Sequence, residues 1–261
     1  MTDLPDLLAA NAAAVFGAMT LLWLVSLALR DAGIVDIFWG LGFVLVAWVS
    51  YALGDAPHDR RLLMAVLVSV WGSRLAGYLA WRNLGKEEDY RYRAMRKRHG
   101  GAWWWRSLVV VFWLQGLLMV VVSLPVQVNA LPAGDSLGPL AWIGAAVWAV
   151  GLGFETVGDL QLARFKADPD NAGAVMDRGL WRYTRHPNYF GDFVVWWGLW
   201  LVALDAPGTW WTAIGPIVMS VLLMKVSGKD LLERSLKKRR AGYEDYVRRT
   251  NGFFPGPPRP S

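Results

Sequence analysis

Long uncharged stretches constrain this chain most strongly, because each is long enough to cross the ~30 Å hydrocarbon core of a bilayer as a helix. A backbone in lipid must satisfy its hydrogen bonds internally, so such stretches are expected to be helical. The whole chain is 55% hydrophobic and only 18% charged. We therefore predict an all-α, polytopic membrane protein with seven spans. They lie at roughly 7–29, 33–53, 61–82, 106–127, 137–161, 190–204 and 209–226.

We expect one membrane domain over residues 1–261, with an N-terminal half at 1–127 and a C-terminal half at 137–254. After the last span, the segment LLERSLKKRRAGYEDYVRRT has the pattern of an amphipathic helix with a break near Gly242. Such a helix lies on the membrane surface or closes over a site. The sequence thus predicts seven transmembrane helices followed by a cytoplasmic amphipathic helix.

The distribution of Lys and Arg predicts the orientation, because basic loops stay in the cytoplasm. The basic segments are 82–106, 162–188 and the tail from 225, and the loops without Lys or Arg are 128–136 and 205–208. We expect the N-terminus outside and the C-terminus in the cytoplasm, in a bacterial inner membrane. Arg60 and Arg61, in a short outer loop, are the exception.

Two kinds of chemistry have little support in the composition. The chain has no cysteine, which rules out disulfides and thiolate catalysis. Its histidines, His58, His99 and His186, stand in three separate loops without ligand spacing, so we predict no metal site. Membrane lipids and a lipid substrate are the expected partners. No nucleic acid is expected, and the sequence implies no obligate protein partner.

The segment RGLWRYTRHPNYFGD, residues 178–192, concentrates polar groups between two apolar spans. An arginine guanidinium group can donate hydrogen bonds to two phosphate oxygens at once. This pattern between apolar spans therefore favours an anionic cofactor beside an apolar substrate. Topology alone is the alternative explanation of its charge. The cations are Arg178, Arg182, Arg185 and, when protonated, His186, and they are followed by Asn188 and Asp192.

The fifth span ends in GFETVGDLQLARFK, where Glu155 and Asp159 share one helical face. Polar groups inside a membrane are costly and are therefore functional candidates. Carboxylates there could bind ribose or amide groups, while Arg164 and Lys166 hold phosphate. The alternative is a set of interhelical salt bridges.

The first three spans carry a second group of candidates. Trp71, Arg74 and Tyr78 recur at helical spacing in the third span, and Asp36 lies in the second. A structural pair between Asp36 and Arg74 is one interpretation. Tyr78 is either a proton donor or a core tyrosine with a hydrogen-bond partner.

RYTRHPNYFGD, a further span, and GKDLLERSLKKRRAGYEDYVRRTNGFFP together resemble a known C-terminal region. It is shared by steroid 5α-reductases, sterol C14-reductases and isoprenylcysteine carboxyl methyltransferases. VDIFWG, RNLGKEEDYRY and GDLQLARFK resemble the bacterial branch of the first family, so the likeness covers most of the chain. This resemblance implies a seven-helix fold with NADPH held at the cytoplasmic side.

The resemblance also implies which residues contact the cofactor. Glu155, Asp159 and Lys166 match the family's positions in the fifth span, and Asn188 and Asp192 match those after the HPN turn. The loop that lines the phosphates in relatives carries further candidates here. These are Arg178, Arg182, Tyr183, Arg185 and His186, and we add Arg164 and Tyr189 to the set.

The chain departs from the family on the substrate side. Steroid 5α-reductases use a Gln-Glu pair in the second helix and a tyrosine in the third. Here the nearest acid is Asp36, and Trp71 takes the place of the tyrosine. Our candidates for substrate contacts are Trp39, Trp71 and Arg74. We therefore expect substrate-side helices at 1–127 and a cofactor-binding half at 137–254.

The resemblance thus implies an NADPH-dependent reductase that adds hydride to a C=C bond of a steroid-like or isoprenoid lipid. Asp36 and Tyr78 are the candidates for proton donor. An S-adenosylmethionine-dependent methyltransferase is the first alternative, although a cationic sulfonium does not call for so many bases. A non-enzymatic lipid-binding protein is the second.

Overall fold

The structure, a computed structural model, describes residues 3–132, 136–226, 233 and 242–259. Within these ranges the regular structure is helical, and the one β-type contact is an isolated bridge between Thr184 and Asn251. The all-α prediction is confirmed for this part of the chain.

Five described helices are long and apolar enough to cross a membrane. They are Leu4–Leu29 (α1), Ile34–Leu53 (α2), His58–Asn83 (α3), the run Tyr90–Val122, which contains α4 to α6, and Pro139–Ala167 (α8). The two remaining predicted spans are helical as well. They coincide with Pro187–Leu204 (α9) and with Ile214–Val221 (α10), which continues as a π-helix over Leu222–Val226. Their passage through the membrane, and so the count of seven, stays a prediction.

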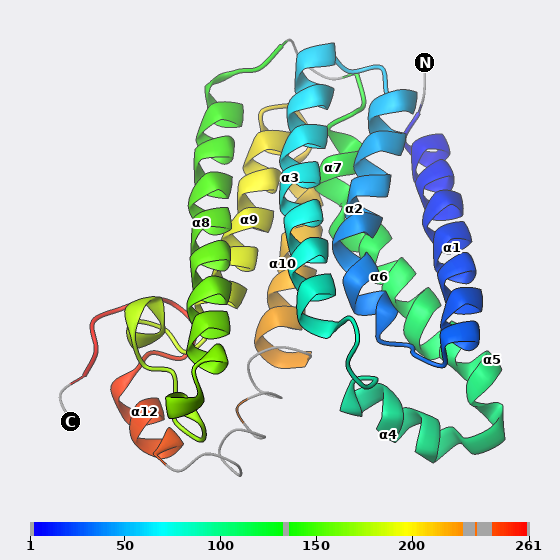
Figure 1. Ribbon diagram of the computed structural model, residues 1–261. Coiled ribbons are helices and arrows are strands. Elements are labelled where there is room, and N and C mark those ends of the chain that lie inside the picture. The colour runs from blue at the N-terminus through cyan, green and yellow to red at the C-terminus, as the bar shows by residue number, and fades with distance from the viewer. Residues whose placement is uncertain (1–2, 133–135, 227–232, 234–241, 260–261) are drawn as a thin grey trace. The chain divides into compact units, whose positions relative to one another are not determined.

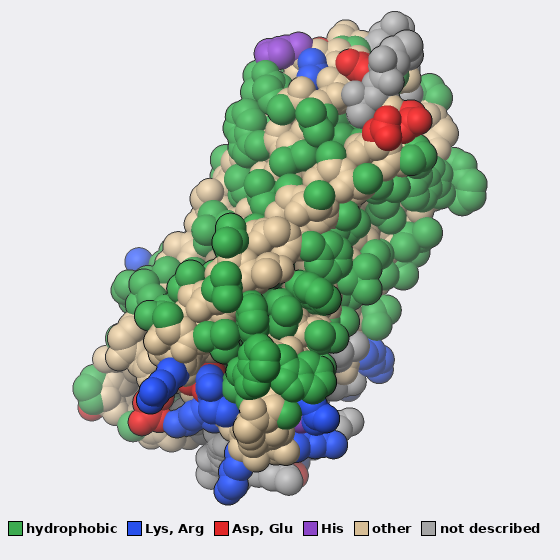
Figure 2. Space-filling view, turned by 90° about the vertical axis from the view of Figure 1, so that its right-hand side faces the viewer, with side chains coloured by type: hydrophobic (Ala, Val, Ile, Leu, Met, Phe, Trp, Pro, Cys, Tyr) green, Lys and Arg blue, Asp and Glu red, His purple; other side chains and the backbone are tan. Residues whose placement is uncertain are grey.

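The surface supports a membrane protein. Figure 2 shows one face on which hydrophobic side chains fill the middle, while Lys and Arg gather at the lower end. Leu21 and Leu29 on α1 are 65% and 61% exposed. Such apolar exposure would be unfavourable in water but suits hydrocarbon.

The contacts within the chain divide it into two units, Met1–Pro139 with Ala203–Ile214, and Leu140–Val202 with Gly215–Ser261. We call them unit 1 and unit 2. The roles assigned to the halves, and the description as one domain, stay predictions.

Unit 1 is built on the side-by-side helices α1, α2, α3 and α6 (Figure 1). The helices α2 and α3 approach most closely where Gly40 faces Gly72, since a Cβ on Gly40 would lie 2.3 Å from the Gly72 carbonyl oxygen. Its shorter elements follow α3 in the chain. They are Tyr90–His99 (α4), Gly100–Ala102 (η1), Trp103–Ser107 (α5), the π-helix Leu108–Trp113 (η2), Leu114–Val122 (α6), Leu124–Val128 (α7) and, later, Trp210–Ala213 (η5).

Unit 2 is built on α8 and α9, which lie side by side (Figure 1). Their backbones touch, because a Cβ on Gly191 would lie 2.4 Å from the backbone nitrogen of Glu155. Only glycine permits this approach. The unit also contains nearly all of α10 with its π-helical continuation, the short 3₁₀ turns Pro169–Asn171 (η3) and Gly179–Arg182 (η4), and the helix Tyr243–Arg249 (α12).

The predicted break near Gly242 is present. Gly242 has a φ of +78°, and α12 begins at the next residue. Most of the preceding part of the predicted amphipathic helix, residues 231–232 and 234–241, lies outside the described residues. The complete C-terminal helix therefore stays a prediction.

Candidate functional site

The contact between α8 and α9 brings together the acids and the amide that the resemblance points to. Glu155 and Asp159 on α8 are both 3% exposed, and Asp192 on α9 is 9% exposed. The Asn188 side-chain amide donates to the Asp159 carboxylate over 3.0 Å. Burying such groups is costly unless they are paired, so this polar face needs partners from the protein or from a ligand.

The turn before α9 is fixed onto α8 by three features of its sequence. Gly179 adopts a φ of +58° and packs against Gln161, which a side chain at this position would strike. The Leu180 backbone N–H donates to the Gln161 side-chain oxygen over 2.9 Å. The Trp181 indole donates to the Gly158 carbonyl over 3.0 Å. The cations of this turn therefore stand on a rigid support.

The Arg185 guanidinium makes four hydrogen bonds to described residues. Its Nε and Nη2 donate to Glu233 over 2.9 and 3.2 Å, and its Nη1 donates to the carbonyls of Val247 and Thr250 over 3.2 and 2.6 Å. His186 shares the same acid, with its Nε2 lying 3.0 Å from Glu233. Arg185 thus joins the turn to α12, and its role as a phosphate ligand stays a prediction.

Glu233 was not a candidate from sequence, yet it is the centre of this cluster. Burial alone would raise its pKa, but hydrogen bonds from His186 and Arg185 and the nearby Arg185 charge lower the pKa to about 2. Its carboxylate is therefore ionised at neutral pH. The only signal in the sequence is an acid in a run rich in Lys and Arg.

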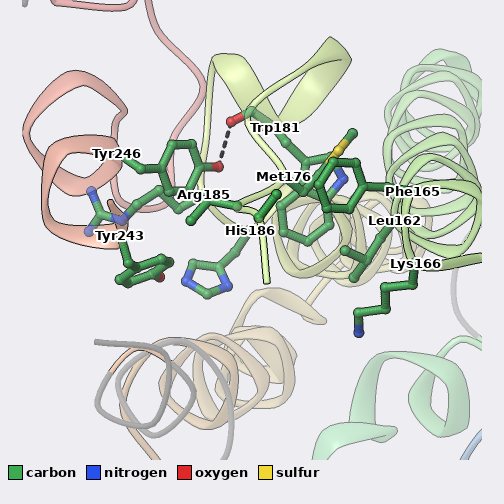
Figure 3. Close-up of a pocket in the computed structure, with 11 residues that line it drawn as sticks. Leu162, Phe165, Lys166, Met176, Trp181, Arg185, His186, Tyr243 and Tyr246 are labelled. Atoms are coloured by element: carbon green, nitrogen blue, oxygen red, sulfur yellow. Dashed lines mark hydrogen bonds between the residues drawn. The ribbon is translucent and has the colours of Figure 1, made fainter. Parts of the chain in front are cut away.

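A cavity of about 120 Å³ lies beside this cluster (Figure 3). Leu162, Phe165 and Lys166 from α8 stand on one side, and Tyr243 and Tyr246 from α12 stand on the other. Its size is close to the ~150 Å³ cavity that admits a benzene-sized ring. The rest of the lining consists of Trp181, Arg185, His186, Ala174, Val175 and Met176.

Two tyrosines hold the α12 side of this cavity in place. The Tyr246 hydroxyl donates to the Trp181 carbonyl over 2.5 Å. Burial, followed by the Glu233 charge, raises the pKa of Tyr243 to about 12, so it stays a neutral phenol. Tyr189 stacks on the His186 ring, with centroids 5.5 Å apart. The cavity thus has aromatic walls and cationic groups at its edge.

The predicted phosphate loop is divided between two spaces. Arg185 and His186 line the cavity just described, whereas Arg178 and Arg182 line a separate, larger hollow of about 450 Å³. Tyr183, which lies between them in sequence, is 46% exposed. The sequence did not indicate this division.

Unit 1 holds a second polar cluster, and here the sequence-based pairing was wrong. Asp36 is bonded by Arg91, with Nη2 to Oδ2 at 2.7 Å, and by the Tyr92 hydroxyl, also at 2.7 Å. Both partners come from α4, so the partner of Asp36 is not Arg74. Gln115 on α6 lies 3.5 Å from the Tyr92 hydroxyl. Asp36 also borders a hollow of about 300 Å³.

The other candidates of unit 1 lie along α2 and α3. The Arg74 guanidinium stands 5.5 Å from the centre of the Tyr78 ring. Trp71 is fully buried, and its ring lies 5.7 Å from that of Phe43, which in turn contacts Trp39 at 5.2 Å. The predicted substrate residues Trp39 and Trp71 therefore belong to one aromatic cluster.

The remaining predictions concern two basic residues at the end of α8 and metal binding. Arg164 and Lys166 are both exposed at the end of α8, and Lys166 also lines the aromatic cavity. No group of His, Asp or Glu side chains among the described residues is arranged to hold a metal ion.

Comparison with known proteins gives one result. No curated protein and no solved structure matches the chain. A family model described as "Protein of unknown function (DUF1295)" matches residues 22–250. Because the match covers most of its length, this chain belongs to the DUF1295 family.

Proposed function

We propose that this protein is an NADPH-dependent membrane reductase that transfers hydride to a C=C bond of a steroid-like or isoprenoid lipid. The observation that carries the proposal is the aromatic cavity of unit 2, with Lys166 at its edge and the buried Asp159–Asn188 pair on the same helices. The resemblance of RYTRHPNYFGD and the C-terminal segment to steroid 5α-reductases gives the reaction class.

The residues present fit the parts of NADPH. The rings of Phe165, Trp181 and Tyr243 can pack on a flat heterocycle, and Lys166 supplies positive charge for phosphate. An amide beside a carboxylate, as in Asn188 and Asp159, can both donate to and accept from ribose or carboxamide groups. When bound, NADPH supplies the hydride, and the protein orients its ring and excludes water.

The proton donor is assigned to Tyr78. Both carboxylate oxygens of Asp36 already accept hydrogen bonds, one from Arg91 and one from the Tyr92 hydroxyl. The Arg74 and Arg82 guanidinium groups stand 5.5 and 5.6 Å from the centre of the Tyr78 ring.

Cofactor titration of the purified protein in nanodiscs tests the proposal. NADPH should bind, with S-adenosylmethionine much weaker, and Lys166→Gln should weaken NADPH binding by roughly tenfold to a hundredfold, as the loss of one charge-assisted contact does. Lys97→Gln, at an exposed position in unit 1, is the matched control and should change nothing.

The other outcomes identify the alternatives. If the protein binds S-adenosylmethionine but not NADPH, the result supports a methyltransferase and contradicts a reductase. Binding of neither cofactor would leave a lipid-binding protein without catalysis.

A further inference from the structure

The larger hollow of unit 2 gathers arginines from three separate segments. Arg178 and Arg182 come from the turn before α9, Arg249 from α12, and Arg259 from the tail. Asp177 is the one carboxylate among the described residues that line it, and the hollow has a volume of about 450 Å³. The aromatic cavity shares none of these residues.

Backbone hydrogen bonds assemble this hollow. The Arg185 N–H donates to the Asn251 carbonyl over 2.9 Å, and the Gly256 N–H donates to the Tyr183 carbonyl over 3.1 Å. The Arg259 N–H donates to the Arg249 carbonyl over 2.8 Å. The tail is therefore folded back along the turn, and the fold itself brings the arginines together.

The charge of the hollow is not balanced within the described residues. Arg249 lies 3.6 Å from Asp177, a loose ion pair. The side chains of Arg178, Arg182 and Arg259 make no hydrogen bond or ion pair to any residue that the structure describes. Like charges held in one hollow repel each other, and a bound anion relieves the repulsion.

The chemistry of the lining favours phosphate. A guanidinium group binds phosphate oxygens through two parallel N–H bonds, and several such groups can share one phosphate. Two exposed aromatic residues belong to the same segments, Tyr183 at 46% and Phe254 at 58%. Aromatic side chains of this kind are typical of the membrane–water interface, where phospholipid headgroups lie.

We propose that this hollow is a phosphate-binding site distinct from the cofactor cavity. Its ligand is a phosphate group carried by an anionic phospholipid or by a soluble phosphate compound. The proposal does not rest on the reductase activity, because it uses other residues and another space.

The test uses the full chain in detergent and the double variant Arg178→Gln/Arg182→Gln. Binding is measured with inorganic phosphate, with phosphatidylglycerol in mixed micelles, and with phosphatidylcholine as the neutral lipid. The wild type should bind an anionic probe, and the variant should bind it at least tenfold more weakly. Arg248→Gln, one residue from Arg249 but outside the hollow, is the matched control and should bind like the wild type.

Each outcome has one meaning. Binding of phosphatidylglycerol alone identifies a lipid headgroup, and binding of inorganic phosphate as well identifies a general phosphate site. Equal binding of phosphatidylcholine and phosphatidylglycerol without phosphate binding, or no binding at all, overturns the proposal. If the double variant loses NADPH affinity to the same extent, the hollow belongs to the cofactor site and the proposed distinction is wrong.

Discussion

The two units each contain an arginine–carboxylate pair that joins segments far apart in sequence, but the pairs differ in exposure. In unit 1, Arg91 and Asp36 have side chains that are 34% and 21% exposed and border a hollow. In unit 2, Arg185 and Glu233 are 9% and 12% exposed, and the arginine also holds two carbonyls. The same chemistry therefore gives a partly open polar site in one unit and a closed structural link in the other.

The largest loss of stability should come from removing the buried link between Arg185 and Glu233 in unit 2. Glu233→Gln leaves Arg185 buried without an ionic partner, which costs about 3–5 kcal/mol. Thermal unfolding in detergent would measure this loss of stability. Glu244→Gln, at an exposed position on α12, is the control. The double variant Glu233→Gln/Arg185→Met should recover part of the loss. A single variant as stable as the control would contradict the assignment of a structural link.

Acid should weaken the same link. The pKa of Glu233 is lowered from 4.5 to about 2, so its contribution is complete above pH 4.5 and is lost as the pH falls toward 2. The shift corresponds to about 3 kcal/mol. Melting temperatures recorded from pH 6 to pH 3 should fall less steeply for Glu233→Gln than for the wild type. Parallel curves would show that another group controls acid stability.

The partly exposed pair of Asp36 and Arg91 in unit 1 should contribute less to the free energy of unfolding. Asp36→Asn removes charge-assisted hydrogen bonds from a partly solvated pair, which costs roughly 1.5–3 kcal/mol. Arg91→Met should restore part of this stability, whereas Arg74→Met should not, because Arg91 is the partner. Recovery by Arg74→Met alone would return the pairing to the one inferred from sequence. NADPH binding should be unchanged in Asp36→Asn.

The smallest effect on stability is expected at the contact between α8 and α9. Asn188→Ala removes one hydrogen bond to Asp159, worth about 1 kcal/mol. Its effect on NADPH affinity should be larger than its effect on the melting temperature, if the amide also serves the cofactor. Unchanged affinity would restrict Asn188 to a structural role.

The sequence predicted what depends on local pattern. The apolar runs located the helices, and Gly242 marked the start of α12, because span length and backbone freedom are local properties. The sequence also indicated Asp159 and Asn188, and their side chains are hydrogen-bonded to each other. It did not find Arg91 as the partner of Asp36, since the two are separated by 55 positions and α4 had no assigned place.

The site in unit 2 was only partly predictable for a related reason. Arg182 and Arg185 are close in sequence, but the 3₁₀ turn directs them into different spaces. Glu233 was hidden among Lys and Arg residues, and its burial depends on contacts with the turn and α12. Which cations remain available for a ligand is thus decided by tertiary structure.

The central claim is that unit 2 binds NADPH, with one ring of the cofactor in the aromatic cavity. Hydrogen–deuterium exchange of the protein in nanodiscs, with and without NADPH, tests it most directly, because binding protects the amides that it covers or stiffens. We expect protection over residues 155–166 and 181–192, and none over 34–40 of unit 1. Protection confined to unit 1, or no change at saturating NADPH, would contradict the claim.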